Sequence, residues 1–278
     1  TIKIDLKSHN FLIAKTMESQ MAFIKTIVME LSAKFGFDYE NAMKFLNTKT
    51  ETISKDESKV SNSKQTPATT PQILTDIVNY LKQYNINISE AIEGEGRGGS
   101  LKDEGSVKKL LWASQFKDNI RDEKARKFGD MTVIDYDKKT EYVVNIKTSI
   151  GGTDNCFSKI GVVYALTDIP ANKLPKSMNF MTMNKLINEH KADIPGRDYY
   201  FLCIDKKDSS NVMVRGAKQI QNWVVNINPG NILQVNWKKE KKVEAVNRTW
   251  DEAYEVLIGG VIKSLNGFWN NVPTDWKL

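Results

Sequence analysis

The sequence is poor in the residues that several common kinds of site require. It holds two histidines and two cysteines among 278 residues, which leaves little for a histidine-based zinc site or a Ser-His triad. Cys156 and Cys203 show no metal-ligand spacing and no disulfide framework. We therefore expect two thiols in a reducing compartment, and we expect a cytoplasmic protein.

Long hydrophobic runs are also missing. No stretch of about 18 apolar residues occurs, so we expect no helix that spans a membrane. Residues 1–10 mix charged with apolar side chains and lack the apolar segment of a signal peptide. The hydrophobic share of 40% is enough to bury a core, and the formal net charge is +6. A basic balance is consistent with a polyanionic partner, although solvated lysines alone explain it equally well.

Composition and periodicity divide the chain into three regions. Residues 1–47 carry apolar residues at helical spacing and predict a helical N-terminal arm. Residues 48–70 are rich in Thr, Ser and Lys and predict an exposed polar linker. Residues 71–278 form the core in this interpretation. Its expected helices cover residues 71–84, 103–116 and 249–265. Its later strands are expected at residues 199–204, 211–214, 223–227 and 232–237.

The glycine-rich stretch EGEGRGGS, residues 93–100, predicts a flexible loop. It lacks the spacing and the Lys-Ser/Thr ending of a Walker motif, so we do not expect nucleotide binding. Arg97 within this stretch is a candidate for a contact with a phosphate of DNA. A plain surface loop is the competing interpretation.

Residues 130–148 (DMTVIDYDKKTEYVVNIKT) predict a β-hairpin, because two β-rich runs flank a polar turn at residues 137–140. If residues 136 and 141 face each other across the turn, counting places Asp130 opposite Lys147. Asp130, Asn145 and Lys147 then share one face of the sheet, because directly paired residues and residues two apart point to the same side. The opposite face is apolar, with Met131, Val133, Val144 and Ile146.

The face that carries Asp130, Asn145 and Lys147 suits the hydrolysis of a phosphodiester. This reaction needs a metal that neutralises charge on the phosphate and a positioned water as the nucleophile. Asp130 is a hard oxygen ligand for Mg²⁺, and the backbone carbonyl of Ile146 is a further candidate. Lys147 is placed to orient the water or to stabilise the developing negative charge. These residues predict a Mg²⁺-dependent catalytic site.

The pattern resembles the PD-(D/E)xK nucleases, and locally it is most similar to restriction enzymes of the EcoRV type. That family places an aspartate on one strand and an acidic-x-lysine triplet on the next. This chain has DMTV at residues 130–133 and NIKT at residues 145–148, with Phe128-Gly129 in place of the usual proline. The resemblance covers about 20 residues, and we find no detailed match over the remainder of the chain.

The resemblance implies a type II restriction endonuclease that depends on Mg²⁺ and cuts both strands of double-stranded DNA at specific sites. The implied fold is α/β, with a central mixed and twisted sheet flanked by helices and with the hairpin at its centre. A homodimer is the expected assembly, because two-fold symmetry is the simplest way to cut both strands of a palindrome. An acidic residue from a neighbouring helix often lies near the metal in this family. Glu104 is therefore a candidate metal ligand, although a carboxylate at the start of a helix needs no such role.

Position 145 departs from the family pattern, because Asn145 is neutral where an acidic residue is expected. An amide oxygen can coordinate a metal, but it brings no negative charge. The chain is then an inactivated Asp-to-Asn variant, or asparagine is natural and a carboxylate of Glu104, Glu123 or Asp154 replaces the missing charge. The third explanation is that the motif is a coincidence.

The segment after Lys147 approaches DNA in the enzymes that the chain resembles. Here it offers hydroxyls, an amide and a lysine, which suit contacts with phosphates and base edges. The candidate residues are Thr148, Ser149, Thr153, Asn155, Ser158 and Lys159. A simple polar loop is the competing interpretation.

Three other functions stay open at this point. The chain could be a repair or recombination nuclease that recognises DNA structure in place of sequence. It could be a catalytically inactive DNA-binding protein in which Asn145 is native. It could also have no nucleic-acid partner, with Asp130 and Lys147 forming only a cross-strand ion pair.

Overall fold

The structure, a computed structural model, describes residues 67–88, 96–123, 129–150, 153–227 and 231–270. Contacts divide the chain into two compact units, Thr1–Lys64 and Gln65–Leu278. The expected helical arm and most of the expected linker lie outside the described residues. The last residues of the expected linker belong to the second unit: the N–H of Ala68 donates to the carbonyl of Arg248, and the hydroxyl of Thr70 donates to the side chain of Gln219.

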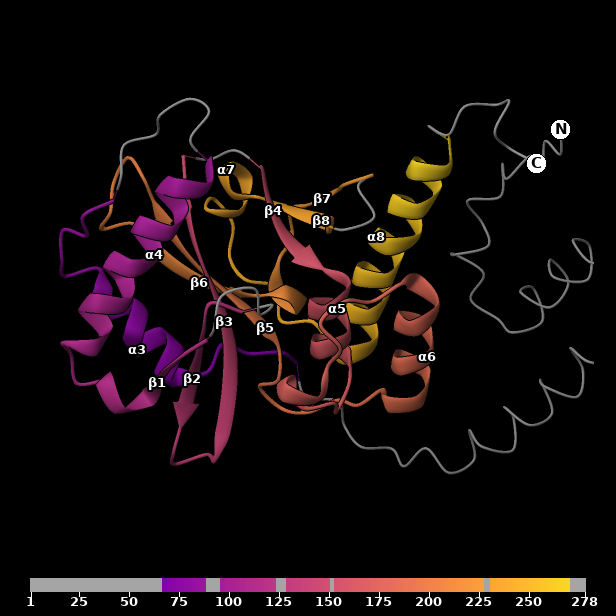
Figure 1. Cartoon of the computed structure of the whole chain (residues 1–278), viewed down its shortest axis with the longest axis horizontal. Helices are drawn as coiled ribbons and strands as arrows, with labels where there is room; N and C mark the ends of the chain where they lie inside the picture. The colour runs from indigo at the N-terminus through magenta and orange to yellow at the C-terminus, as the bar shows by residue number, and fades with distance from the viewer. Residues whose placement is uncertain (1–66, 89–95, 124–128, 151–152, 228–230, 271–278) are drawn as a thin grey trace, which may run out of the picture. The chain divides into compact units, whose positions relative to one another are not determined.

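The second unit is built on a central five-stranded mixed sheet (Figure 1). Its strands, in spatial order, are β1 (Ile120–Asp122), β2 (Met131–Asp135), β3 (Thr140–Ser149), β5 (Tyr199–Asp205) and β6 (Val212–Gly216). β3 pairs with β5 in parallel, and the other neighbours are antiparallel. The expected mixed sheet flanked by helices is confirmed, and β3 of the predicted hairpin is its middle strand.

A second, smaller sheet has three strands. Their spatial order is β4 (Thr153–Ser158), β8 (Asn231–Asn236) and β7 (Trp223–Val225). The strands expected at residues 223–227 and 232–237 are thus present within one or two residues of their predicted ends. β4 was not predicted: residues 148–159 were expected as a segment that contacts DNA, with a polar loop as the competing interpretation, and they include the end of β3, all of β4 and the first residue of α5.

Six α-helices accompany the two sheets in the described residues. They are α3 (Gln72–Leu81), α4 (Gly96–Trp112), α5 (Lys159–Leu166), α6 (Phe180–His190), α7 (Trp237–Glu240) and α8 (Trp250–Asn270). Short 3-10 helices η1 (Lys117–Asn119), η2 (Ala171–Lys173) and η3 (Ala217–Gln219) connect them.

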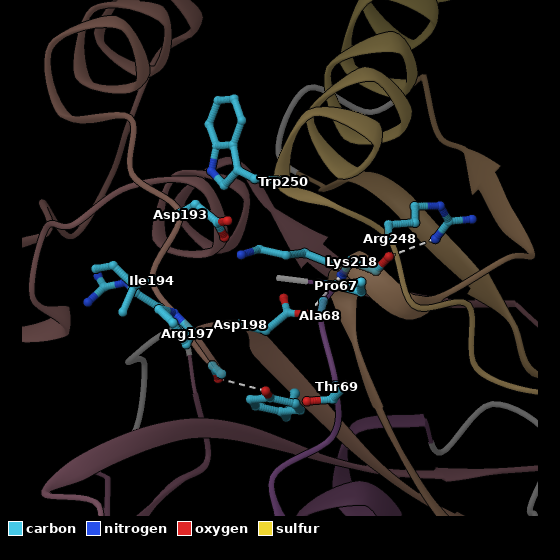
Figure 2. A pocket seen from close by; sticks show the side chains of 13 residues that line it. Pro67, Ala68, Thr69, Asp193, Ile194, Arg197, Asp198, Lys218, Arg248 and Trp250 are labelled. Atoms are coloured by element: carbon cyan, nitrogen blue, oxygen red, sulfur yellow. Dashed lines mark hydrogen bonds between the residues drawn. The ribbon is translucent and has the colours of Figure 1, made fainter. Parts of the chain in front are cut away.

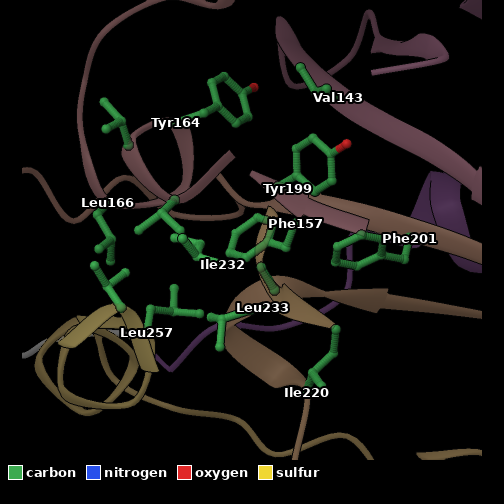
Figure 3. Close-up of a cluster of buried hydrophobic side chains, with 14 of the residues drawn as sticks. Val143, Phe157, Tyr164, Leu166, Tyr199, Phe201, Ile220, Ile232, Leu233 and Leu257 are labelled. Carbon is green, nitrogen blue, oxygen red and sulfur yellow. The ribbon is translucent and has the colours of Figure 1, made fainter. Parts of the chain in front are cut away.

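Two hydrophobic cores lie on opposite faces of the central sheet, because alternate residues of a strand point to opposite sides. The first, here called the α4-side core, joins Ile77 and Leu111 of α3 and α4 to Val144 and Ile146 of β3. The second, the α5-side core, holds Val143 of β3 together with residues of α5, α6 and α8 (Figure 3). The expected apolar face of the hairpin is therefore buried under α3 and α4, and its polar face lies on the α5 side.

The α5-side core depends on a close approach between α5 and β4. A side chain at Gly161 would place its Cβ 2.6 Å from the ring of Phe157, so only glycine fits there. Phe157 in turn stacks on Trp223, with ring centroids 5.1 Å apart. Trp237 and Trp250 are buried, as expected for packing residues.

The helices expected to begin at residues 71 and 249 begin within one residue of these positions, at Gln72 and Trp250. Thr249 caps α8: its hydroxyl accepts from the N–H of Glu252, and the Glu252 carboxylate accepts from the N–H of Thr249. Pro71 precedes α3 at the N-cap position. The glycine-rich stretch was predicted wrongly, because Gly96–Ser100 belong to α4 and not to a loop. Glu104, expected at a helix start, consequently lies near the middle of α4.

Candidate functional site

The β2–β3 hairpin differs from the expected register by two residues. Met131 pairs with Val144, and Asp135 pairs with Thr140 at the closing end. The loop is shifted because the carboxylate of Asp135 accepts from the N–H of Lys138, and Lys139 adopts a positive φ of 52°. A shift of two residues keeps every side chain on its predicted face, since the side-chain period of a strand is two.

The observed register places Asp130 next to Val144 of β3 and not opposite Lys147. The N–H of Asp130 donates to the carbonyl of Val144 at 2.9 Å, although Val144 already pairs with Met131, so the ladder is irregular at Asp130. Oδ2 of Asp130 accepts from the N–H of Ile146 at 2.7 Å. Asp130 therefore lies at the position where β2 ends and β3 continues. The carbonyl of Ile146 points to the same edge of β3 as its N–H, because both groups of one residue point to the same neighbouring strand.

The electrostatic surroundings of Asp130 combine burial with charges of both signs. Burial raises the pKa of Asp130 above its usual range, and the nearby Glu104 carboxylate raises it further. The positive charges of Lys147 and Lys108 and the N–H of Ile146 act in the opposite direction. The charges of Lys147 and Glu104 thus lie close enough to act on the carboxyl group of Asp130.

Asn145 is buried with one hydrogen-bonding atom unsatisfied. The residue is 9% exposed, and its Oδ1 has no hydrogen-bond partner among the described residues. A buried acceptor without a partner costs about 1–3 kcal/mol, so its persistence calls for an explanation such as an ion or a water. Together with the carboxylate of Asp130 and the carbonyl of Ile146, Oδ1 provides the hard oxygen donors that Mg²⁺ prefers. The residues at this point therefore fit such a cation.

Glu104 reaches the site from the other face of the sheet. It is half-buried on α4, and its Oε1 lies 2.5 Å from Nζ of Lys108. The same Nζ lies 2.7 Å from Oδ1 of Asp122 on β1, so Lys108 joins α4 to the edge strand. Burial acts to lower the pKa of Lys108, but the hydrogen bonds that its ammonium group donates to both carboxylates raise the pKa above its usual value. Glu104 is thus engaged in a buried ion pair and is not simply at a helix start.

The residues predicted to contact DNA have diverse surroundings. The hydroxyl of Thr148 donates to Oδ2 of Asp103 at 2.7 Å, and Asp103 also binds Lys206 at 2.8 Å. Ser149 is buried. Ser158 is the N-cap of α5 and accepts from the N–H of Gly161.

Lys159, the first residue of α5, lies over the ring of Phe180, and burial lowers its pKa. The side chains of Arg97, Thr153 and Asn155 lie outside those that the structure describes. The side chain of Asp154, one of the carboxylates that could replace the missing charge at position 145, also lies outside those that the structure describes.

A small cavity lies away from the hairpin, beside η3 (Figure 2). It encloses about 40 Å³ and is lined by Asp198, Lys218 and Trp250, among others. Asp198 is 2% exposed, and its carboxylate accepts from the N–H groups of Tyr199 and Lys218. Burial raises the pKa of Asp198 to about 6. The neighbouring Arg248 donates to the carbonyl oxygens of Lys218 and Ile220, so these polar groups serve the packing of η3.

Sequence analysis gave no signal for the Asp198 centre, because its partners are backbone groups brought together by the turn from β6 into η3. The carboxylate excludes any side chain at Gly216, whose Cβ would lie 2.2 Å from Oδ2 of Asp198. Lys108 was also not predicted as part of the hairpin site. Its spacing of four residues from Glu104 on one helix was the available signal.

Comparisons with known proteins do not assign a function to this chain, so the function has to be inferred from the residues of the site. No family model matches the chain, and no curated protein matches it either. Within the part of the chain that the structure describes, no helix has the length and apolarity needed to cross a bilayer. No group of three or more His, Cys, Asp and Glu side chains suited to a metal is found among the same residues.

Proposed function

We propose that this chain is a Mg²⁺-dependent endonuclease of the PD-(D/E)xK type that hydrolyses double-stranded DNA at specific sites, as type II restriction enzymes do. One observation carries the proposal. Asp130, Asn145 and Lys147 lie together where β2 ends on the central strand β3, with Asp130 bound to the N–H between the other two. The motif resemblance and the net charge of +6 support the same function.

Each residue of the site has a chemical role in this proposal. Asp130, the amide oxygen of Asn145 and the carbonyl of Ile146 would hold the cation. When bound, Mg²⁺ supplies charge neutralisation at the phosphate and lowers the pKa of a coordinated water. Lys147 orients the attacking water or stabilises the negative charge that develops on the phosphate oxygens.

The substrate and the assembly follow from the same reasoning. Phosphate contacts give most of the affinity of a DNA-binding protein, and an excess of lysine and arginine supplies them. Two identical sites related by a two-fold axis cut both strands of a palindrome, so we propose a homodimer.

Whether the chain is an active enzyme or an inactive DNA-binding protein depends on the effect of the neutral Asn145. The direct test is digestion of a long natural DNA with Mg²⁺ by the chain as given and by its Asn145→Asp variant. Discrete fragments from the variant alone would identify Asn145 as the inactivating residue of a site-specific nuclease. Discrete fragments from both would show that another carboxylate supplies the charge.

Other outcomes of this digestion point to other functions. A smear would indicate a structure-directed or nonspecific nuclease. No cleavage by either protein, on DNA of varied source, would contradict the enzymatic function. Salt-sensitive DNA binding without cleavage would then favour an inactive DNA-binding protein, and the absence of DNA retention at modest salt would exclude that function as well.

A further inference from the structure

We infer that α6 and the turn before it form a surface that binds the DNA substrate, with lysines on the phosphates and asparagines on the edges of the bases. This inference rests on the proposed function, which names DNA as the substrate, and goes further by assigning a surface that holds it. It is carried by the exposed face of α6, by the charge of the segment around it and by a contact with the start of α5.

The helix α6 has one buried face and one exposed face. Met183 and Ile187 are buried, and Leu186 packs beside them in the α5-side core. The side chains exposed on the other face recur at helical spacing and are Met181, Asn184, Lys185 and Asn188. Met181 is 83% exposed, and the side chain of Lys185 is 69% exposed. One face of α6 therefore presents a continuous row of side chains to a partner.

The side chains of this row are of the kinds that read DNA in the major groove, which has the width to admit an α-helix. An asparagine forms two hydrogen bonds with the edge of adenine, a lysine binds O6 and N7 of guanine, and an apolar side chain contacts the methyl group of thymine. Asn184 and Asn188 are four residues apart, so they lie one above the other on the helix and can face the same groove.

The segment that contains α6 carries positive charge only. Residues 169–188 include three lysines and no aspartate or glutamate, in a chain with 34 acidic residues among 278. Lys173 ends η2, Lys176 lies in the turn before α6, and both are exposed. Glu189, the first acidic residue after the segment, is 4.0 Å from Lys185, at the limit of an ion pair. A surface with one sign of charge attracts the phosphates of DNA.

The first turn of α6 also borders the segment that was expected to contact DNA. Nζ of Lys159 lies 4.6 Å from the centre of the Phe180 ring. Lys159 begins α5 directly after β4 and is the last residue of that candidate segment. The helices α5 and α6 lie side by side (Figure 1). Two separate parts of the chain therefore contribute lysines to one surface.

The phosphate contacts are tested by the binding of a short duplex DNA of mixed sequence to the full chain in EDTA, measured by fluorescence anisotropy at several salt concentrations. We expect Lys173→Gln combined with Lys176→Gln to weaken binding at least about tenfold and to reduce the slope of log K against log salt by about 2, because two phosphate contacts are lost. Circular dichroism during thermal unfolding checks that the variant is folded.

The matched control is Lys138→Gln combined with Lys139→Gln. These lysines are equally exposed, but they follow Asp137 in the hairpin turn. The control removes the same net charge and should change the affinity less than about twofold. Equal weakening by the two double variants, or no weakening by the first, would overturn the inference.

The base contacts are tested by selection from a pool of duplexes with a randomised central segment. The chain as given should enrich particular sequences, and Asn184→Ala combined with Asn188→Ala should lose the preference for adenine at one or more positions. Asn79→Ala, at an exposed asparagine of α3, is the control and should keep the full preference. An unchanged preference in the double variant, or no enrichment by the chain as given, would overturn the role in reading bases.

These experiments separate the inference from the proposed function. Absence of cleavage by Asn145→Asp with DNA binding intact would contradict the nuclease function and leave the surface in place. Equal binding by the chain as given and by the Lys173 and Lys176 variant would overturn the surface, whatever the cleavage by Asn145→Asp. No binding of DNA by the chain as given would contradict both.

Discussion

Two aspartates, the half-buried Asp130 and the buried Asp198, have different surroundings in the same unit of the chain. Asp198 accepts hydrogen bonds from two backbone N–H groups and lies beside the buried Lys218. Asp130 binds one backbone N–H and lies beside Asn145, whose Oδ1 is unsatisfied. A buried carboxylate whose hydrogen bonds are completed by backbone groups of the fold has a structural role. A carboxylate beside a buried oxygen that has no hydrogen-bond partner marks a place where a bound ligand would complete the interactions.

The largest expected effect is on catalysis at the Asp130 end. In the Asn145→Asp chain, Lys147→Met should lower the DNA cleavage rate at least about 100-fold, because the charge that orients water or stabilises the phosphate is lost. Single-turnover cleavage of a DNA with one site measures this. Lys138→Met, in the exposed hairpin turn, is the control and should leave the rate unchanged. Equal rates in the two variants would remove Lys147 from the mechanism.

The next effect is on stability at the Asp198 end. Asp198→Ala leaves buried N–H groups of Tyr199 and Lys218 without an acceptor, so we expect a loss of roughly 3 kcal/mol in the free energy of unfolding. Asp130→Ala loses one such bond and should cost roughly 1 kcal/mol. Urea denaturation of both variants measures the difference. If Asp130→Ala proved the more destabilising change, Asp130 would be a structural residue and the contrast between the two aspartates would fail.

The dependence of stability on pH sharpens the same contrast. The pKa of Asp198 is raised from 3.8 to about 6 in the folded protein, so the folded state binds a proton that the unfolded state has released. This stabilisation is complete below pH 3.8 and is lost as the pH rises through about 6, by roughly 3 kcal/mol in total. The Asp198→Asn variant should show a flatter stability profile between these values, as measured by urea denaturation at several pH values. An unchanged profile would mean that Asp198 does not titrate in this range.

The smallest effect concerns the helix that borders the Asp198 cavity. Thr249 caps α8 one residue before Trp250, which lines the cavity. Thr249→Ala should lower the free energy of unfolding by about 1 kcal/mol through loss of the cap. Thermal unfolding measures this, and DNA cleavage by the folded fraction should not change. A loss of cleavage would connect the two regions that the structure keeps apart.

The sequence predicted those parts of the structure that depend on local periodicity. The faces of the hairpin followed from alternation, and an even register error left them correct. The later strands and the helix that begins after Thr249 were also predicted from the sequence, because their signals are contained in a few consecutive residues. The coarse fold class, a mixed sheet flanked by helices, followed from the same patterns.

What the sequence could not predict depends on partners that are distant along the chain. Residues 153–158 pair with β8, about 80 residues later, so their strand identity is set by tertiary contacts. The helical state of Gly96–Ser100 opposes the low helix propensity of glycine. The exact hairpin register required the bond between Asp135 and Lys138.

The central claim is that the Asp130 end of the sheet is a cation-dependent nuclease site and the Asp198 end is structural. It is tested most directly by Mg²⁺-dependent cleavage of DNA with three chains: Asn145→Asp alone, with Asp130→Asn added, and with Asp198→Asn added. We predict cleavage by the first chain, none by the second, and cleavage per folded molecule by the third equal to that of the first. Equal cleavage by the first two chains, or none by the first, would contradict the claim.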